Sequence, residues 1–181
     1  MVSTPATSIM RSGVSSSNHP SGSAAVCRVD DFALTAAERR LFEALRRREV
    51  PFLLLGLGAA LLHGAPVATQ DLDIWFERTD DERIREAARD AGGFWIPGFG
   101  LQPPAFGGAE LDRIVVVLTA HGLDSFSDEY ARAADHEVDG LVLRVLPLER
   151  IIATKRATNR PKDLAQLPAL EATLRARDDL G

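Results

Sequence analysis

Short apolar runs alternate along this chain with segments whose apolar residues recur every three or four positions. The stretch DLDIWF, at positions 71–76, shows strict alternation, because every second residue is apolar and the others are acidic or aromatic. A period of two predicts a strand with one buried face. The stretch TAAERRLFEALRRR shows the longer period, and Thr35 and Glu38 form a capping-box pattern at its start. That stretch is therefore expected to be an amphipathic helix.

The same patterns, with the turn residues between them, predict ten elements. They are a helix from Thr35, a buried strand at 52–55, a short helix at 59–62, a strand at 71–76, a helix at 79–91, a central strand at 111–119, a short helix at 127–134, a hairpin at 136–146, a helix at 148–157 and a last helix from 161. Gly56 and Gly58 predict a tight turn, and Asp139-Gly140 predicts a type I′ turn. Residues 93–110 predict a loop with at most one short strand, and Pro168 predicts a kink or a restart of the last helix.

This order of helices and strands indicates an α/β chain of the α+β type, with helices packed against a mixed sheet and further helices at the C-terminus. Residues 1–28 are rich in Ser, Thr, Pro, Gly and Ala and hold almost no large apolar residue. Such a segment buries too little surface to offset its ordering entropy. We therefore expect a disordered tail at 1–28 and one domain at 29–181.

Composition narrows the class of protein. The 181 residues are 45% hydrophobic and carry a formal net charge of −5, which argues against a protein that coats nucleic acid. Cys27 is the single cysteine, so an internal disulfide framework is excluded. No apolar run approaches the length of a membrane span, and the N-terminus lacks the apolar region of a signal peptide. We expect a cytoplasmic protein that does not contact a membrane.

Two carboxylates on one strand are the first candidate for chemistry. Asp71 and Asp73 project to the same face, with Cβ atoms roughly 7 Å apart. Two negative groups so close destabilise each other unless a cation or a shared proton lies between them. Mg²⁺ prefers carboxylate oxygens and often binds substrate phosphates as well. The pair is therefore a candidate clamp for Mg²⁺ or Mn²⁺.

A glycine turn and a basic segment extend this candidate site. Gly56 and Gly58 open a short helix, and such a turn lets a phosphate approach the backbone. The basic segment holds six cationic side chains against the single acid Glu149: Arg144, Arg150, Lys155, Arg156, Arg160 and Lys162. Most of these are expected to lie on a solvated helix face, but a local cluster also suits phosphates. Carboxylates, a glycine turn and basic groups are together the parts of a phosphoryl-transfer site.

The stretch LLGLGAALLHGAPVATQDLDIWF resembles the signature of the nucleotidyltransferase superfamily of the DNA polymerase beta type. More narrowly, it is similar to small bacterial nucleotidyltransferase-like proteins, including abortive-infection toxins, whose strand reads TKDLDIWV. LPLERIIATKRATNRPKDLAQLPALEATL resembles their C-terminal segment, so the resemblance covers about residues 50–175. It implies a nucleotidyltransferase fold, with an NTP as substrate. It also implies metal ligands at Asp71 and Asp73 and nucleotide contacts at Gly56, Gly58, Thr69, Lys155, Arg160, Lys162 and Asp163.

The resemblance leaves the third carboxylate of the family open. If the strand at 111–119 is aligned on its first residues, Asp112 is the third metal ligand and the catalytic base. If it is aligned on its last residues, the position is filled by Val116. The two positions share a face but lie about 13 Å apart along a strand. Three other departures are Gly-Leu-Gly in place of the usual glycine pair, Val67 and Ala68 before Thr69 where the family often has Arg or Ser, and Arg150 at a position that is usually acidic.

Three hypotheses follow. The leading one is a metal-dependent nucleotidyltransferase that moves NMP from an NTP to a hydroxyl of a tRNA, a partner protein or a small molecule, in one setting as a toxin of a toxin–antitoxin pair. A partner chain or an oligomer would then complete the small site. The second is a degenerate family member that binds without turnover. The third is an α/β domain whose aspartate pair binds nothing.

Overall fold

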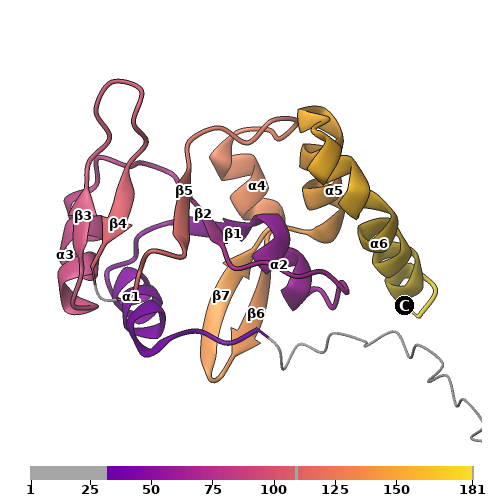
Figure 1. Ribbon diagram of the computed structural model, residues 1–181. Coiled ribbons are helices and arrows are strands. Elements are labelled where there is room, and N and C mark those ends of the chain that lie inside the picture. The colour runs from indigo at the N-terminus through magenta and orange to yellow at the C-terminus, as the bar shows by residue number, and fades with distance from the viewer. Residues whose placement is uncertain (1–31, 109, 181) are drawn as a thin grey trace, which may run out of the picture.

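The computed structural model describes residues 32–108 and 110–180, and the predicted tail at 1–28 lies outside them. A mixed five-stranded sheet forms the centre (Figure 1). Its strands, in spatial order, are β5 (Ile114–Val117), β2 (Leu72–Phe76), β1 (Phe52–Leu55), β7 (Leu141–Val145) and β6 (Ala134–Val138). β1 runs antiparallel to β2 and parallel to β7, while β2 and β5 are parallel. The predicted mixed sheet is therefore confirmed.

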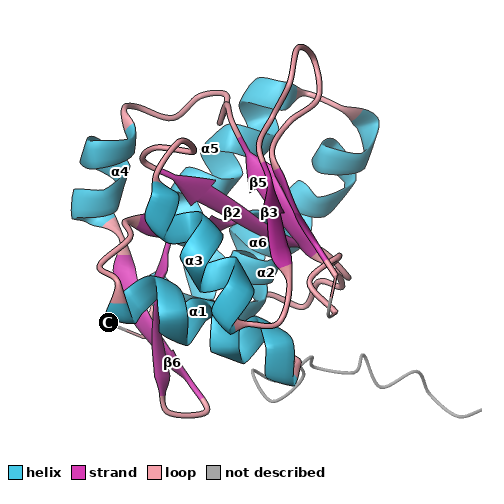
Figure 2. Cartoon of the chain, turned by 90° about the vertical axis from the view of Figure 1, so that its left-hand side faces the viewer, coloured by secondary structure: helices cyan, strands magenta, loops and turns pink. Residues whose placement is uncertain are grey.

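Six helices flank this sheet in the described residues. They are α1 (Ala36–Arg47), α2 (Gly56–Leu62), α3 (Glu82–Asp90), α4 (Phe126–Arg132), α5 (Leu148–Thr158) and α6 (Pro161–Asp178). α1 and α3 pack together on one face, as Figure 2 shows. On the other face, Phe126 of α4 meets Trp75 of β2 edge to face, with ring centroids 5.3 Å apart. α5 and α6 form a pair at the C-terminal end of the chain (Figure 1).

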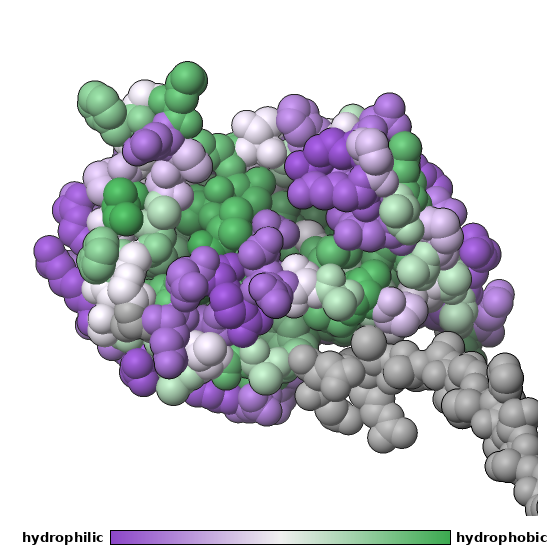
Figure 3. Space-filling view, in the orientation of Figure 1, coloured by the Kyte–Doolittle hydropathy of each residue, from purple (hydrophilic) through white to green (hydrophobic). Residues whose placement is uncertain are grey.

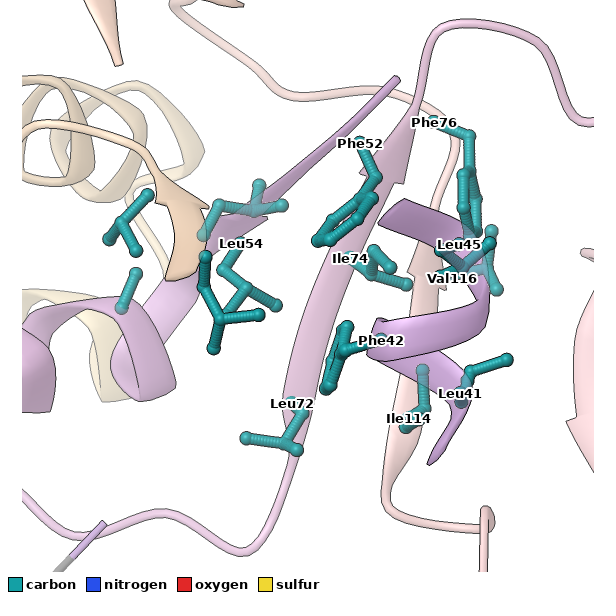
Figure 4. Packing of buried hydrophobic residues seen from close by; sticks show 14 of the residues in the cluster. Leu41, Phe42, Leu45, Phe52, Leu54, Leu72, Ile74, Phe76, Ile114 and Val116 are labelled. Carbon is teal, nitrogen blue, oxygen red and sulfur yellow. The ribbon is translucent and has the colours of Figure 1, made fainter. Parts of the chain in front are cut away.

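The core lies between α1 and the sheet. Leu72, Ile74 and Phe76 are buried, as the alternation in β2 predicted. Figure 4 shows Phe42 and Leu45 of α1 among these strand residues. Complete burial of one such side chain contributes roughly 1.5–3 kcal/mol. The other face of β2, which carries the aspartates, is consequently left for α4, α5 and solvent.

Several local predictions are confirmed. Thr35 and Glu38 form a reciprocal capping box at the start of α1. The strand at Phe52–Leu55 has the predicted bounds. Asp139 and Gly140 both have positive φ values, 50° and 80°, which is the backbone of a type I′ turn between β6 and β7. Short-range chemistry fixes each of these features, so no knowledge of the tertiary structure was required.

Other boundaries were predicted wrongly. α2 begins at Gly56 rather than at residue 59, so Gly58 lies inside the helix instead of in a turn. α3 is capped by the Asp81 side chain, which accepts from the Arg83 N–H, and not by Thr79. The last helix does not restart at Pro168, which lies within the continuous helix α6. At α3 a neighbouring residue with equally suitable cap chemistry took the position, whereas α2 begins after Leu55 without a side-chain cap.

Two sheet predictions were also wrong. The strand at 111–119 is short, Ile114–Val117, and lies at the edge of the sheet rather than in its centre. Residues 93–110 hold two short strands rather than at most one, because β3 (Phe94–Ile96) and β4 (Ala105–Gly107) pair with each other. We call this pair and its connecting loop the β3–β4 arm. Figure 3 shows hydrophobic side chains at its tip, where Phe99 and Leu101 are exposed.

Within the described ranges, no helix has both the length and the apolar composition needed to cross a membrane.

Candidate active site

Asp73 lies directly against the backbone of Gly56. Leu55 is the partner of Asp73 in the β1–β2 register, so the residue after Leu55 comes beside the carboxylate. A Cβ atom at position 56 would lie 1.8 Å from Asp73 Oδ2, and Gly56 has φ +69°. Only glycine satisfies both conditions. At this corner of the sheet, therefore, a carboxylate lies in direct contact with backbone that carries no side chain.

Burial, and then the negative charge of Asp71, raise the pKa of the Asp73 carboxyl to about 6. The cations Lys155, Lys162 and Arg160 act in the opposite direction but do not outweigh these two causes. The negative charge of ionised Asp73 is therefore not fully compensated by the positive charges around it. A divalent cation between the two aspartates would supply it.

Asp71 is exposed at the start of β2. Thr69 orders the backbone there, since its Oγ1 accepts from the Asp71 N–H at 3.1 Å and donates to the Asp71 carbonyl at 3.3 Å. Asp71 and Asp73 are two residues apart and project to the same side of the strand. Oxygen donors of this kind fit Mg²⁺ or Mn²⁺, and two of them suit a cation that also takes phosphate oxygens from a substrate.

The structure does not bring Asp112 to this pair. Asp112 is exposed and precedes β5, whose register places Val115 beside Asp73. Val116, the alternative position, points into the core and is only 7% exposed. No three His, Cys, Asp or Glu side chains gather into a possible metal site within residues 32–108 and 110–180. Where a third carboxylate would approach Asp73, this chain has valine.

A cavity of about 340 Å³ opens beside Asp73. The β-sheet contributes its floor, and α5 and the start of α6 contribute its opposite wall. The described side chains that line it come from these elements and from the loop after β5: Leu55, Asp73, Val117, Thr119, Ala120, His121, Leu146, Ile151, Thr154, Lys155, Thr158, Arg160 and Asp163. Gly56 adds bare backbone. One carboxylate therefore faces a largely basic and hydroxylic wall.

Lys155 and Asp163 organise that wall. Lys155 is 8% exposed, and its Nζ donates to Asp163 Oδ1 at 3.2 Å and to Gln166 Oε1 at 2.7 Å. Asp163 also accepts from Arg160 Nε at 2.5 Å and from Thr158 Oγ1 at 2.9 Å. Burial opposes ionisation of Asp163, but the hydrogen bonds from Arg160, Thr158 and Lys155 lower its pKa to about 2. Asp163 therefore orients the two basic groups of this wall.

The remaining predicted site residues have other surroundings. Gly58 is buried, and a Cβ there would meet Leu72 Cδ2 at 3.3 Å and the Asp71 carbonyl at 3.5 Å, so it allows α2 to approach β2. Lys162 is exposed on the first turn of α6. Of the other basic residues, Arg144 binds Asp135 and Arg156 binds Glu171.

Arg150, at the position that is usually acidic in the resembling proteins, has a structural partner. Its Nε lies 3.0 Å from Oε2 of Glu129, a residue with no exposed surface on α4. Burial opposes ionisation of Glu129, but hydrogen bonds from Arg150 and from the Asp124 N–H lower its pKa. Arg150 therefore joins α5 to α4 and does not face the cavity.

Sequence reasoning missed two polar residues of the cavity. Thr154 has a buried Oγ1 atom for which the described residues supply no hydrogen-bond partner. A buried hydroxyl without a partner is costly, so this atom suits a ligand. His121 lies in the loop that follows β5, and no spacing of histidines in the sequence singles it out. The four-residue spacing of Thr154 and Thr158 on one helix, opposite the aspartates, was the available signal.

No family model matches the chain, and no curated protein matches it. Solved structures do. The chain superimposes on crystalline ANT(2")-Ia in complex with adenylyl-2"-tobramycin with a TM-score of 0.54 and 17% identity, covering 77% of this chain and 88% of that one. The solution structure of ANT(2'')-Ia superimposes with a TM-score of 0.50 and 13% identity, covering 80% of this chain and 92% of that one. An antigenic nucleotidyltransferase-like protein from Paracoccidioides brasiliensis superimposes with a TM-score of 0.47 and 15% identity, covering 75% of this chain and 74% of that one. On the first two similarities, this chain has the nucleotidyltransferase fold.

Proposed function

We propose that this protein is a nucleotidyltransferase, which transfers NMP from an NTP to an acceptor hydroxyl and depends on Mg²⁺ or Mn²⁺. The observation that carries the proposal is the half-buried Asp73 carboxylate, which lies against Gly56 at the mouth of the cavity and beside Asp71. The fold similarity to ANT(2")-Ia supports the same reaction class. We propose the cytoplasm as its compartment, in keeping with the single cysteine.

The charged residues in and beside the cavity have distinct roles in this proposal. Asp71 and Asp73 would hold the cation, which when bound neutralises phosphate charge and favours the departure of pyrophosphate. Gly56 leaves room for the substrate to approach the carboxylate. Lys155 and Arg160, held by Asp163, present positive charge toward the phosphates. Positioning and charge neutralisation are the main contributions that a protein makes to phosphoryl transfer.

A second candidate is a nucleotide-binding protein without turnover. Val115 beside Asp73 favours it, because a third carboxylate at that position would be both a metal ligand and a base. Asp112 would have to move along the strand to replace it. This candidate shares the nucleotide site with the first and differs only in the chemical step.

The acceptor is a hydroxyl of a small molecule, a partner protein or a tRNA. The protein of similar fold is bound to an adenylylated aminoglycoside, which makes a small polyhydroxylated cation the first acceptor to test. A partner-protein acceptor would fit a toxin–antitoxin pair. A partner chain or an oligomer could complete the site in either case.

The experiment is an incubation of the protein with each α-³²P-labelled NTP and Mg²⁺, in the presence of tobramycin, total tRNA or the product of an adjacent gene. Asp73→Asn is the matched inactive variant. We expect labelled product from the wild-type protein and none from the variant. Transfer that survives Asp73→Asn would show that the reaction takes place elsewhere, and nucleotide binding without transfer would support the second candidate.

A further inference from the structure

Transfer to a hydroxyl requires a group that removes its proton. Of the described residues that line the cavity, five have ionisable side chains: Asp73, His121, Lys155, Arg160 and Asp163. Asp73 is committed to the cation in the proposed function. Lys155 and Arg160 are both bound to Asp163, which accepts hydrogen bonds on both oxygens and is held in its ionised form. His121 is left as the side chain that can act as a general base.

The loop that carries His121 is fixed against α5. Gly122 has φ +74°, and a Cβ atom there would lie 2.7 Å from Ala157 Cβ and 3.3 Å from the Ala153 carbonyl oxygen. The backbone therefore touches the helix at a point where no side chain would fit. Leu123 packs against the core on the other side of this contact. The histidine backbone is thus held beside the helix that carries Thr154 and Lys155.

His121 also lies where two cavities meet. A second cavity of about 240 Å³ is lined by His121, Ala157, Thr158 and Arg160. Three of these residues, His121, Thr158 and Arg160, line the larger cavity of Asp73 as well. The smaller cavity is sufficient for a single ring or side chain rather than a whole cofactor. A nucleotide in the larger cavity and an acceptor group in the smaller one would meet at His121.

We propose that His121 is the general base of the transfer and that the adjoining 240 Å³ cavity receives the acceptor hydroxyl. This inference rests on the proposed function. The imidazole takes the hydroxyl proton while the acceptor oxygen bonds to the α-phosphorus. The bond from the α-phosphorus to the bridging oxygen breaks, and pyrophosphate leaves with that electron pair. His121 then releases its proton to solvent. No oxidant or further reactant is required.

The charged groups around His121 suit this role. Arg160 borders both cavities, and Lys155 lies on the wall opposite the sheet. Neither cation competes with His121 as the base, because both are held by Asp163. Asp163 is neutralised by these same cations, and Asp73 faces the proposed metal position. Thr158 Oγ1 donates to Asp163 and is not free to act as the base.

A first test needs no acceptor. His121 is exposed, so diethyl pyrocarbonate should modify it, and mass spectrometry can follow the rate for each histidine. We expect Mg²⁺ with the α,β-methylene analogues of the four NTPs to slow modification of His121 at least fivefold. His136, at the far edge of the sheet, should be unaffected. Equal modification of His121 with and without every analogue would overturn its placement beside the nucleotide.

A second test separates a base from a structural residue. His121→Asn should lower transfer to the best acceptor by about 10²- to 10⁴-fold, while His136→Asn should leave it unchanged. Imidazole and its methyl derivatives should restore His121→Ala at least tenfold, in the order of their basicity, which a structural role would not produce. Full transfer activity of His121→Asn, or rescue of His121→Ala that does not follow the basicity of the added imidazoles, would overturn the assignment of His121 as the base. If nucleotide analogues protect His121 from modification but the wild-type protein transfers no NMP to any acceptor, the proposed transferase function is overturned, and the role of His121 as its base with it.

Discussion

The Asp73 carboxylate and the Gly56 backbone share a space that holds no additional atom: a methyl group on Gly56 would lie 1.8 Å from Asp73 Oδ2 and 2.8 Å from its Cγ. Gly56→Ala is therefore expected to displace the carboxylate as well as strain the chain. A left-handed backbone costs a non-glycine residue roughly 1–2 kcal/mol, and the overlap adds to this. We expect a loss of about 3 kcal/mol in the free energy of unfolding in urea.

Gly64→Ala is the matched control. Gly64 also has a positive φ, +81°, but a Cβ atom there meets nothing within 4 Å. Its substitution should show the backbone cost alone, about 1 kcal/mol, with Mg²⁺–nucleotide binding intact. Equal effects of the two substitutions on stability and on binding would mean that the contact with Asp73 is unimportant.

Asp73 should make the protein less stable as the pH rises. Because its pKa is raised to about 6 in the folded protein, the folded state binds the proton more tightly than the unfolded state between about pH 4 and pH 6. Metal-free protein should lose at most about 3 kcal/mol of unfolding free energy across this window, relative to Asp73→Asn. Above pH 6 the variant should be the more stable protein, and added Mg²⁺ should reduce the difference. Urea titrations at pH 4.5 and pH 7.5 measure this. The same difference in unfolding free energy between the wild-type protein and Asp73→Asn at both pH values would refute this account.

Val115→Asp should place a third carboxylate beside Asp73. Val115 is 40% exposed and is the β5 partner of Asp73, so the substitution disturbs little packing. We expect Mn²⁺ affinity, measured by calorimetry, to rise about tenfold, which corresponds to about 1.4 kcal/mol. Val116→Asp, which buries the charge in the core, should instead unfold the protein. Unchanged Mn²⁺ affinity in a folded Val115→Asp protein would place the metal away from this face.

Removal of the Asp163 charge should be costly. Lys155 is nearly buried, so Asp163→Asn leaves its ammonium group without a counter-charge. Loss of one partner of a buried pair costs roughly 3–5 kcal/mol, whereas Glu171→Gln, at the more exposed contact with Arg156, should cost about 0–1 kcal/mol. Urea unfolding at pH 7 measures both. Losses of similar size would show that the Lys155–Asp163 pair is solvated.

The sequence was sufficient for features that depend on neighbours in the chain. Alternation predicted the buried and open faces of β2, and cap and turn chemistry predicted the start of α1 and the β6–β7 turn. The placement of Asp71 and Asp73 on one face followed from the same period of two. Such features require only local geometry, and tertiary packing agreed with them.

The third carboxylate could not be resolved in this way, because it depends on the register between β2 and β5. That register is fixed by contacts far apart in the chain, and it places Val115, which neither alignment had chosen, beside Asp73. His121 and Thr154 were missed for a related reason. They line the cavity only because the loop after β5 meets α5. The spacing of Thr154 and Thr158 indicates a shared helix face, but it does not show what that face meets.

Nucleotide binding in the Asp73 cavity is the central claim, and isothermal titration of each NTP tests it most directly. The account predicts binding of one NTP to the wild-type protein that requires Mg²⁺ or Mn²⁺. It also predicts an affinity at least tenfold weaker in Asp73→Asn, although that variant should be the more stable protein at pH 7.5. An NTP that binds Asp73→Asn as tightly as the wild-type protein, or equally well in EDTA, would contradict it.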